Sequence, residues 1–149
     1  MSGKQFITFY LYEQLYGIDV SLVQEITRKS NITKVSLAPD FIAGLINLRG
    51  QIATAIDLKV LFNIEGVDKH KALEEREDLK NVICRNESTL LSFIVDEVGD
   101  VIEVEDSDFS QTPSVVDEQV QQFMKGIYKL STDILCVLDF HKIINFLNK

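Results

Sequence analysis

One stretch, FIAGLINLRGQIATAIDL at residues 41–58, decides the fold. Two mostly apolar runs, Leu45–Arg49 and Gln51–Asp57, flank Gly50. Glycine gives the backbone the freedom that a tight reversal needs. Two such runs joined by a glycine turn are typical of a β-hairpin. We therefore expect a pair of antiparallel strands that reverses at Gly50.

The same pattern returns 82 residues later without a gap. Phe41-Ile42-Ala43-Gly44 falls on Phe123-Met124-Lys125-Gly126, and Asp57 falls on Asp139, so that aspartate follows glycine by thirteen positions in both copies. Alternating patterns in any two hairpins would produce part of this match. The paired glycines, aspartates and Phe-x-x-Gly steps in one register favour an internal duplication. A further pair of glycines, Gly17 and Gly99, falls in the same register.

The repeat predicts two related lobes, at about residues 5–62 and 87–146. Each copy is too small for a comfortable core of its own, so the two are expected to pack together. Short meanders have edges that must be paired or closed, which favours small barrels. The charged segment at about 63–80 matches neither copy, and we expect it to be an exposed helix or a mobile loop.

Alternating apolar residues predict strands over much of the remaining chain. These strands are expected at residues 6–12, 16–20, 32–37, 82–85, 90–95, 98–104, 124–130 and 134–138. Ser21-Leu22-Val23-Gln24 has the pattern of a capping box and predicts a short helix, with Leu22 and Ile26 packed inward. Asp139 is expected to cap a final helix with an apolar stripe from Phe140 to Leu147. The predicted class is all-β with short helices.

The composition excludes several classes of protein. A content of 46% hydrophobic and 26% charged residues is that of a globular protein and not of a disordered or fibrous one. No apolar run approaches the roughly 20 residues of a membrane span, and the first residues do not begin a signal peptide. Cys84 and Cys136 lie in apolar runs, as small core residues of a reduced, cytosolic protein do.

The net charge of −8 argues against nucleic acid and anionic membranes as partners. This charge is unevenly distributed along the chain. Residues 1–62 carry six basic and five acidic residues, whereas residues 63–149 carry nine basic and eighteen acidic ones. The two parts of the chain are therefore expected to present different surfaces.

No motif predicts catalysis, a cofactor or a metal. Nucleophile elbows, Walker loops and dinucleotide-binding glycine motifs are all missing from the sequence. His70 lies in the charged segment, and His141 is expected on a helix surface. The acidic run from Asp106 resembles the start of an EF-hand loop, but Gln111 replaces the glycine of the turn and Asp117 replaces the bidentate glutamate. We expect no enzyme and no bound metal.

Four motifs resemble the CheW family of chemotaxis coupling proteins. The most specific is Gly44-Leu45-Ile46-Asn47-Leu48-Arg49-Gly50, followed by Ala55-Ile56-Asp57-Leu58-Lys59. The others are Tyr16–Val20 with Val23–Ile26, then Val95–Val98, and Gly126–Leu130. They occur in the family's order and spacing from about residue 5 to 146. The chain departs from the family at Lys59, where arginine is usual.

This resemblance implies a single CheW-like domain over residues 1–149. The implied fold is two intertwined five-stranded SH3-like β-barrel lobes around a shared hydrophobic core, with a short C-terminal helix. The implied function is a non-enzymatic adaptor that couples the cytoplasmic tips of methyl-accepting chemotaxis receptors to the regulatory domain of the histidine kinase CheA. Such an adaptor is cytoplasmic, joins receptor arrays through protein contacts and does not insert into the membrane.

The resemblance also implies a set of receptor- and kinase-binding residues. Arg49 is the foremost, either as a surface guanidinium that binds a partner's carboxylate or carbonyls, or as a clamp that pins its turn to the other lobe. The sequence around Val23 is equally compatible with a side chain exposed to a partner and with one packed in the core. The full set is Val23, Glu25, Gly44 and Arg49, with Ile32 and Val35 on a segment expected to face the kinase.

Two other functions are compatible with the sequence. One is a CheW-like adaptor of a non-flagellar pathway, such as surface motility. The other is a small-ligand-binding β-barrel with an apolar pocket in the seam between the lobes.

Overall fold

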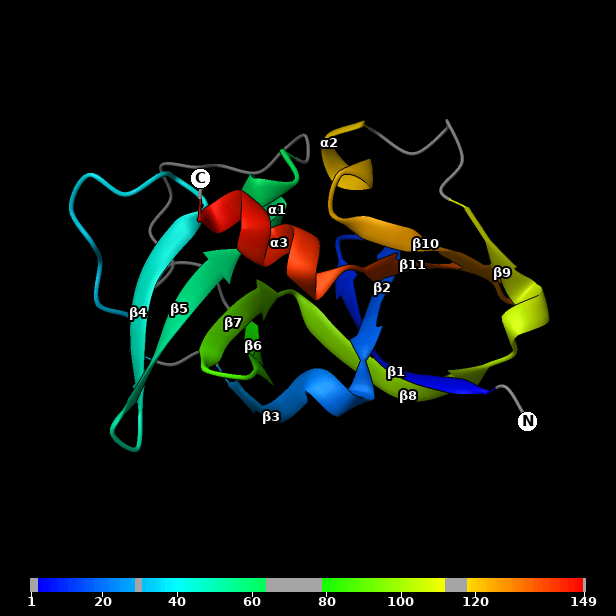
Figure 1. Ribbon diagram of the computed structural model, residues 1–149, viewed down its shortest axis with the longest axis horizontal. Coiled ribbons are helices and arrows are strands. Elements are labelled where there is room, and N and C mark those ends of the chain that lie inside the picture. The colour runs from blue at the N-terminus through cyan, green and yellow to red at the C-terminus, as the bar shows by residue number, and fades with distance from the viewer. Residues whose placement is uncertain (1–2, 29–30, 64–78, 112–117, 149) are drawn as a thin grey trace. The chain divides into compact units, whose positions relative to one another are not determined.

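The computed structural model describes residues 3–28, 31–63, 79–111 and 118–148 (Figure 1). The chain divides into two compact units. Unit 1 comprises Met1–Val20 and Gly99–Lys149, and unit 2 comprises Ser21–Val98. The units therefore differ from the contiguous lobes expected at 5–62 and 87–146. Most of the charged segment, residues 64–78 with His70, lies outside the described residues.

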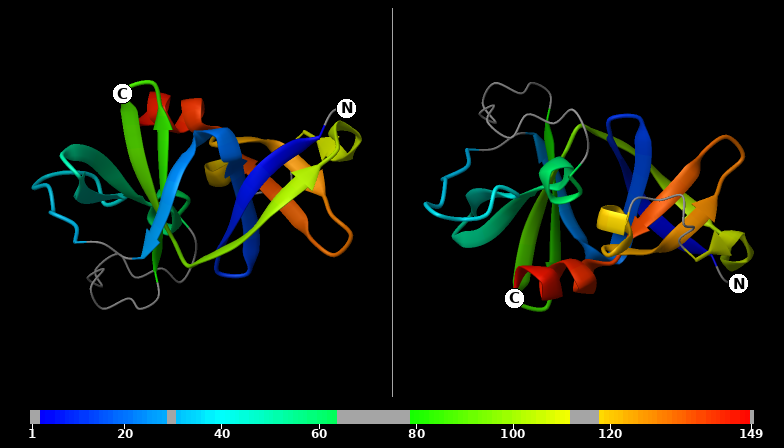
Figure 2. Two further views of the ribbon diagram at one scale, coloured as in Figure 1. Left: turned by 90° about the horizontal axis from the view of Figure 1, so that it is seen from below. Right: turned by 90° about the horizontal axis from the view of Figure 1, so that it is seen from above.

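Unit 1 is built on a six-stranded sheet with the order β8-β1-β2-β11-β10-β9. Its core contains Phe6, Leu15, Val104, Tyr128, Leu135 and Val137. Figure 2 shows this sheet curling, so that β10 and β11 (orange) face β1 (blue) and β8 (yellow-green). The strands are β1 Lys4–Leu11, β2 Gln14–Asp19, β8 Glu97–Val104, β9 Phe109–Ser110, β10 Met124–Lys129 and β11 Ile134–Leu138, and the helical segments are η3 Asp106–Asp108, α2 Glu118–Gln121 and α3 Phe140–Leu147.

Unit 2 is built on a five-stranded sheet with the order β3-β6-β7-β5-β4. Its core contains Ile46, Ala53, Ala55, Leu79, Ile83, Leu90 and Ile94. The buried Asn81 and Ser92 satisfy each other there, because the Ser92 hydroxyl donates to Asn81 Oδ1 at 3.0 Å. The strands are β3 Val23–Arg28, β4 Ile42–Leu48, β5 Gln51–Asp57, β6 Lys80–Asn86 and β7 Thr89–Val95, and the helical segments are η1 Val20–Leu22 and α1 Leu58–Leu61.

The internal duplication is visible in the two hairpins β4–β5 and β10–β11. Ile42 pairs with Ile56 and Met124 pairs with Leu138, and each hairpin has a register shift directly after that pair. The backbone N–H at the end of each hairpin donates to the carbonyl of the residue that precedes it. These bonds, from Asp57 to Phe41 and from Asp139 to Phe123, are both 2.8 Å long. The 82-residue offset thus holds for the residue pairing of both hairpins.

A different offset relates the hairpins β1–β2 and β6–β7. Phe6 pairs with Asp19 as Asn81 pairs with Ile94, which is an offset of 75 residues. The structural counterpart of Gly17 is therefore Ser92, and the ungapped match of Gly17 to Gly99 is wrong. Gly99 lies on β8 because the connections between hairpins differ in length.

Strand exchange explains why the units do not coincide with the two repeats and why unit 1 is discontinuous in sequence. Strand β3 follows β2 along the chain, yet it pairs with β6 of unit 2. Strand β8 follows β7, yet it lies beside β1 of unit 1. Each unit therefore takes one strand from the other repeat. The predicted mainly-β fold with two lobes and a C-terminal helix is confirmed, except that the short β9 makes one sheet six-stranded.

Two predicted elements are wrong. The capping-box pattern at residues 21–24 gives only the 3₁₀ turn η1, because the chain then pairs with β6 and leaves Ile26 40% exposed. Residues 32–37 form no strand, and only Thr33 bridges to Leu45. A turn at Val35 and the positive φ of 65° at Leu37 interrupt the extended backbone.

Other expectations are confirmed at the level of single residues. The carboxylate of Asp139 accepts hydrogen bonds from the backbone N–H groups of His141 and Lys142 and so caps α3. Cys84 and Cys136 are free and buried. His141 is exposed on α3. In the part of the chain that the structure describes, no helix has the length and hydropathy needed to cross a membrane.

Candidate functional site

The turn between β4 and β5 holds Arg49 in an uncommon backbone conformation. Arg49 and Gly50 have φ angles of 50° and 90°. Positive φ at both central residues is the geometry of a type I′ turn, whose twist suits a two-residue hairpin. The Gly50 N–H donates to Asn47 Oδ1 at 3.0 Å and stabilises this turn. The sequence Asn47-Leu48-Arg49-Gly50 thus presents the arginine at the tip of the hairpin.

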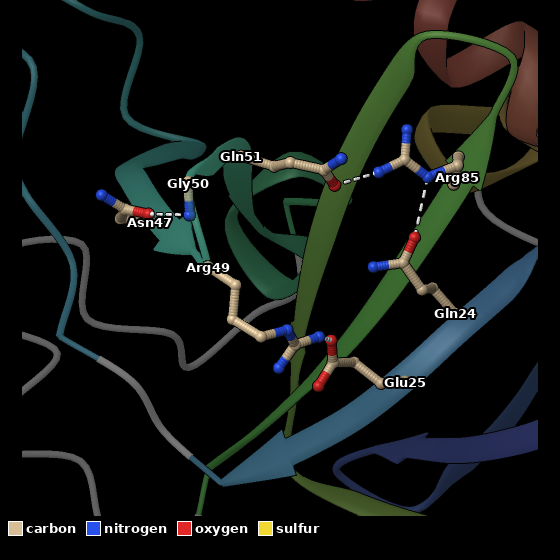
Figure 3. Close-up of polar contacts among 7 residues, drawn as sticks. All are labelled: Gln24, Glu25, Asn47, Arg49, Gly50, Gln51 and Arg85. Carbon is tan, nitrogen blue, oxygen red and sulfur yellow. Dashed lines mark hydrogen bonds and ion pairs between the residues drawn. The ribbon is translucent and has the colours of Figure 1, made fainter.

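The Arg49 guanidinium forms an ion pair with Glu25 on β3 (Figure 3). Strands β3 and β4 are the two edges of the unit 2 sheet, so this pair connects its opposite ends. This ion pair lies within unit 2, whereas the clamp alternative expected a contact with the other lobe. The Arg49 side chain stays 73% exposed and that of Glu25 25% exposed. Exposed pairs contribute only about 0–1 kcal/mol to stability, and the guanidinium retains donors for a partner.

Arg85 on β6 forms a second bridge beside the first (Figure 3). Its Nε donates to Gln24 Oε1 at 2.7 Å, and its Nη2 donates to Gln51 Oε1. Arg85 therefore joins β3 to the start of β5, directly after the Arg49 turn. We call Gln24, Glu25, Asn47, Arg49, Gln51 and Arg85 the polar cluster. The sequence analysis missed Arg85, although its two-residue spacing from the core residue Ile83 places it on the inward face of β6.

Gly44 has a structural role in the segment that precedes β4. Its φ is +147°, and an added Cβ would collide with the Thr33 carbonyl oxygen and lie 2.7 Å from Ile32 Cγ2. Glycine lets Thr33 approach and exchange backbone hydrogen bonds of 2.9 and 2.8 Å with Leu45. Ile32 then packs against the core of unit 2. Gly44 thus sets the position of this segment against β4.

Comparison with known proteins identifies the family. The model of the CheW-like domain matches residues 5–147. The chain belongs to the CheW family. It is 32% identical over 141 residues to the chemotaxis protein CheW of Treponema pallidum, and the match covers 93% of this chain and 81% of that protein. It is 29% identical over 143 residues to CheW of Klebsiella aerogenes, which spans 96% of this chain and 82% of that protein.

A solved CheW structure shares the fold. The scaffolding protein TtCheW of Thermoanaerobacter tengcongensis has a TM-score of 0.79 and 31% identity, and the match covers 92% of this chain and 89% of that one. The CheW fold and family predicted from the motifs are thereby confirmed. The protein is a chemotaxis coupling adaptor of the CheW family.

Contacts among the described residues join four of the six predicted site residues into two pairs. They join Glu25 to Arg49, and they bring Ile32 against Gly44. Val23 is half-buried on β3 opposite Cys84, and Val35 is 44% exposed. No hydrogen bond or ion pair among the described residues links Val23 or Val35 to either pair. Beyond Val35, Leu37 is fully exposed.

Lys59 stands where arginine is usual in the family, so this position keeps a positive charge. Lys59 Nζ lies 2.6 Å from Asp96 Oδ1, with side chains 11% and 24% exposed. This ion pair ties α1 to the turn between β7 and β8. In the described residues, no three histidine, cysteine, aspartate or glutamate side chains are grouped to hold a metal ion.

Proposed function

We propose that this protein couples the cytoplasmic tips of methyl-accepting chemotaxis receptors to the regulatory domain of CheA, as a non-enzymatic adaptor. The observation that carries this proposal is the CheW-like match over residues 5–147, which includes both units. The adaptor acts in the cytoplasm and reaches receptor arrays through protein contacts. The polar cluster supports a binding role, because it consists of two guanidinium groups, three amides and one carboxylate that is already paired with Arg49.

Arg49 is the centre of the proposed contact surface. Its guanidinium can bind a partner's carboxylate in a bidentate manner while Glu25 holds the side chain in position. Val35 lies exposed in the segment before β4 and offers apolar contact, and Ile32 fixes the start of that segment. Val23 shares β3 with Glu25. Gly44 contributes by allowing that segment its path.

A charge exchange separates a contact role of Arg49 from a clamp role. The variants are Arg49→Ala, Arg49→Glu and the double variant Arg49→Glu with Glu25→Arg, which restores an ion pair of reversed direction. Binding to a receptor signalling fragment and to the CheA regulatory domain is measured by titration calorimetry. We expect both single variants to weaken at least one partner by tenfold or more, and the double variant to stay weak.

The matched control is Lys129→Ala, which removes an exposed cation from β10. It should bind both partners as the wild type does. Full recovery of binding in the double variant would show that Arg49 is only a clamp. A wild-type protein that binds neither partner would overturn the proposed function itself.

A further inference from the structure

Unit 1 contains a pocket of about 220 Å³ that belongs to no site described above. Residues from β1, β2, β9, β10 and β11, together with η3, surround it, so it lies at one end of the curled sheet. Its lining combines charged and aromatic side chains: Lys4, Phe6, Asp19, Asp106, Phe109, Lys125, Tyr128 and Val137.

The duplication supplies an internal reference for this end of the barrel. By the 75-residue offset, Lys4 corresponds to Leu79 and Asp19 to Ile94, which are 4% and 3% exposed in the core of unit 2. By the 82-residue offset, the counterpart of Lys125 is Ala43, which packs against the same core. Apolar residues therefore fill this end of the barrel in unit 2, whereas charged residues surround a pocket in unit 1.

Strand β9, which contributes Phe109 to the pocket lining, shows the same contrast between the two units. Ser110 pairs with Ile127 as Thr33 pairs with Leu45, so Phe109 is the counterpart of Ile32. Ile32 packs against the unit 2 core, but Phe109 stays 39% exposed. The absence of a side chain at Gly126 leaves room for the Phe109 ring.

The lining offers charges of both signs around aromatic rings. The Tyr128 ring lies 5.5 Å from Phe6 and 5.2 Å from Phe109, measured between centroids. Among the described residues, Lys4, Lys125 and Asp106 form no ion pair. Three exposed charges, two of them cations and one an anion, are thus grouped at the rim of an aromatic pocket, with the half-buried carboxylate of Asp19 beside them.

We propose that this pocket binds a small zwitterion with an aromatic body, of the size of a free aromatic amino acid. The lysines would receive its carboxylate, the aspartates its ammonium group, and the rings of the lining its aromatic body. The pocket volume of about 220 Å³ is below the roughly 300 Å³ of ordinary ligand pockets, which favours a ligand of this size. This inference goes beyond the proposed coupling function and does not depend on it.

An NMR titration of the full chain with L-phenylalanine tests the proposal. Saturable shifts are expected in the backbone amides of Lys125, Gly126 and Tyr128. 3-Phenylpropionate lacks the ammonium group and phenethylamine lacks the carboxylate, so each should bind at least tenfold more weakly. A wild-type protein that shows no saturable shifts with L-phenylalanine would overturn the proposal, as would equal affinities for the three probes.

Two variants place the ligand in the pocket. Lys125→Ala introduces the residue that unit 2 has at this position, and Asp19→Asn removes a carboxylate with little change in shape. Each should weaken L-phenylalanine binding at least tenfold, whereas Lys129→Ala on the same strand as Lys125 should leave it unchanged. Unchanged affinity in both pocket variants would show that the probe binds elsewhere and would overturn the assignment. Because the readout is ligand binding, it is independent of receptor and kinase coupling.

Discussion

Gly44 and Gly50 both have positive φ angles, of +147° and +90°, but their surroundings differ. A Cβ at Gly44 would collide with the Thr33 backbone, whereas a Cβ at Gly50 would meet nothing within 4 Å. Gly44→Ala therefore combines backbone strain with steric overlap and should lower the free energy of unfolding by about 3 kcal/mol. Gly50→Ala has the strain alone and should cost about 1 kcal/mol. Urea denaturation measures both, and equal losses would contradict the packing described at Gly44.

The two buried cysteines should make the free energy of unfolding depend on pH. Burial raises the pKa of the Cys84 thiol to about 12, and burial together with the charge of Asp133 raises that of Cys136 to about 11. Both folded values lie above the roughly 8.5 of an unfolded thiol. The stabilisation from the neutral thiols is therefore complete below about pH 8.5 and is lost as pH rises toward 11–12.

Urea denaturation under reducing conditions at several pH values between 8 and 10.5 tests this pH dependence. The free energy of unfolding should fall as pH rises, and Cys84→Ala should reduce the slope by up to about 1.4 kcal/mol per pH unit. A thiol reagent at pH 8 should label neither cysteine of the folded protein. An identical slope in the variant, or rapid labelling, would contradict the burial of Cys84.

Local signals in the sequence predicted the hairpin turn at Gly50 correctly. The binding role of Arg49 came from the family resemblance and stays a prediction. Arg85 was missed because its partners, Gln24 and Gln51, are 61 and 34 positions away in sequence. The partnership of Glu25 with Arg49 likewise depends on a contact across 24 positions, between the two edges of a sheet. The alternation of apolar residues along a strand carries no information about contacts between residues so far apart in the sequence.

At the scale of elements, α3 shows how a single side chain starts a helix. Asp139 accepts hydrogen bonds of 3.0 and 3.2 Å from the N–H groups of His141 and Lys142. Asp139→Ala should lower the free energy of unfolding by about 1 kcal/mol, while Asp139→Asn keeps an acceptor and should cost only a few tenths. Thermal and urea denaturation measure the difference. Equal effects of both substitutions would contradict the capping role.

The same reasoning shows why one predicted helix was correct and another was wrong. Asp139 precedes an apolar stripe that continues for two turns, so cap and stripe agree. Ser21 precedes a segment that contains Val23, Ile26 and Thr27, whose β-branched side chains favour strands. Pairing with β6 decides that segment, because tertiary contacts override a local cap. The two hairpins were predicted well, since their turns and alternation lie within about 15 residues.

At the scale of the molecule, strand exchange changes the meaning of the charge distribution. Unit 1 carries five basic and eleven acidic residues and unit 2 carries ten basic and twelve acidic ones. Most of the net charge of −8 therefore belongs to unit 1. The sequence alone had placed the boundary between the two charge distributions at residue 62, which is not a boundary between the units. The duplication was recognisable in the sequence from its equal spacing. The exchange of β3 and β8 was not, because alternation predicts that a strand exists and not which sheet receives it.

The central claim is that this chain couples receptors to the kinase, and one measurement tests it most directly. Receptor signalling fragments and CheA are co-sedimented with and without the protein, and CheA autophosphorylation is measured in the same samples. We expect the wild-type protein to bring CheA into the receptor pellet and to change its activity, and Arg49→Ala to reduce both effects at least tenfold at equal concentration. If the wild-type protein leaves both the pellet and the kinase activity unchanged, the protein is not a coupling adaptor for these partners.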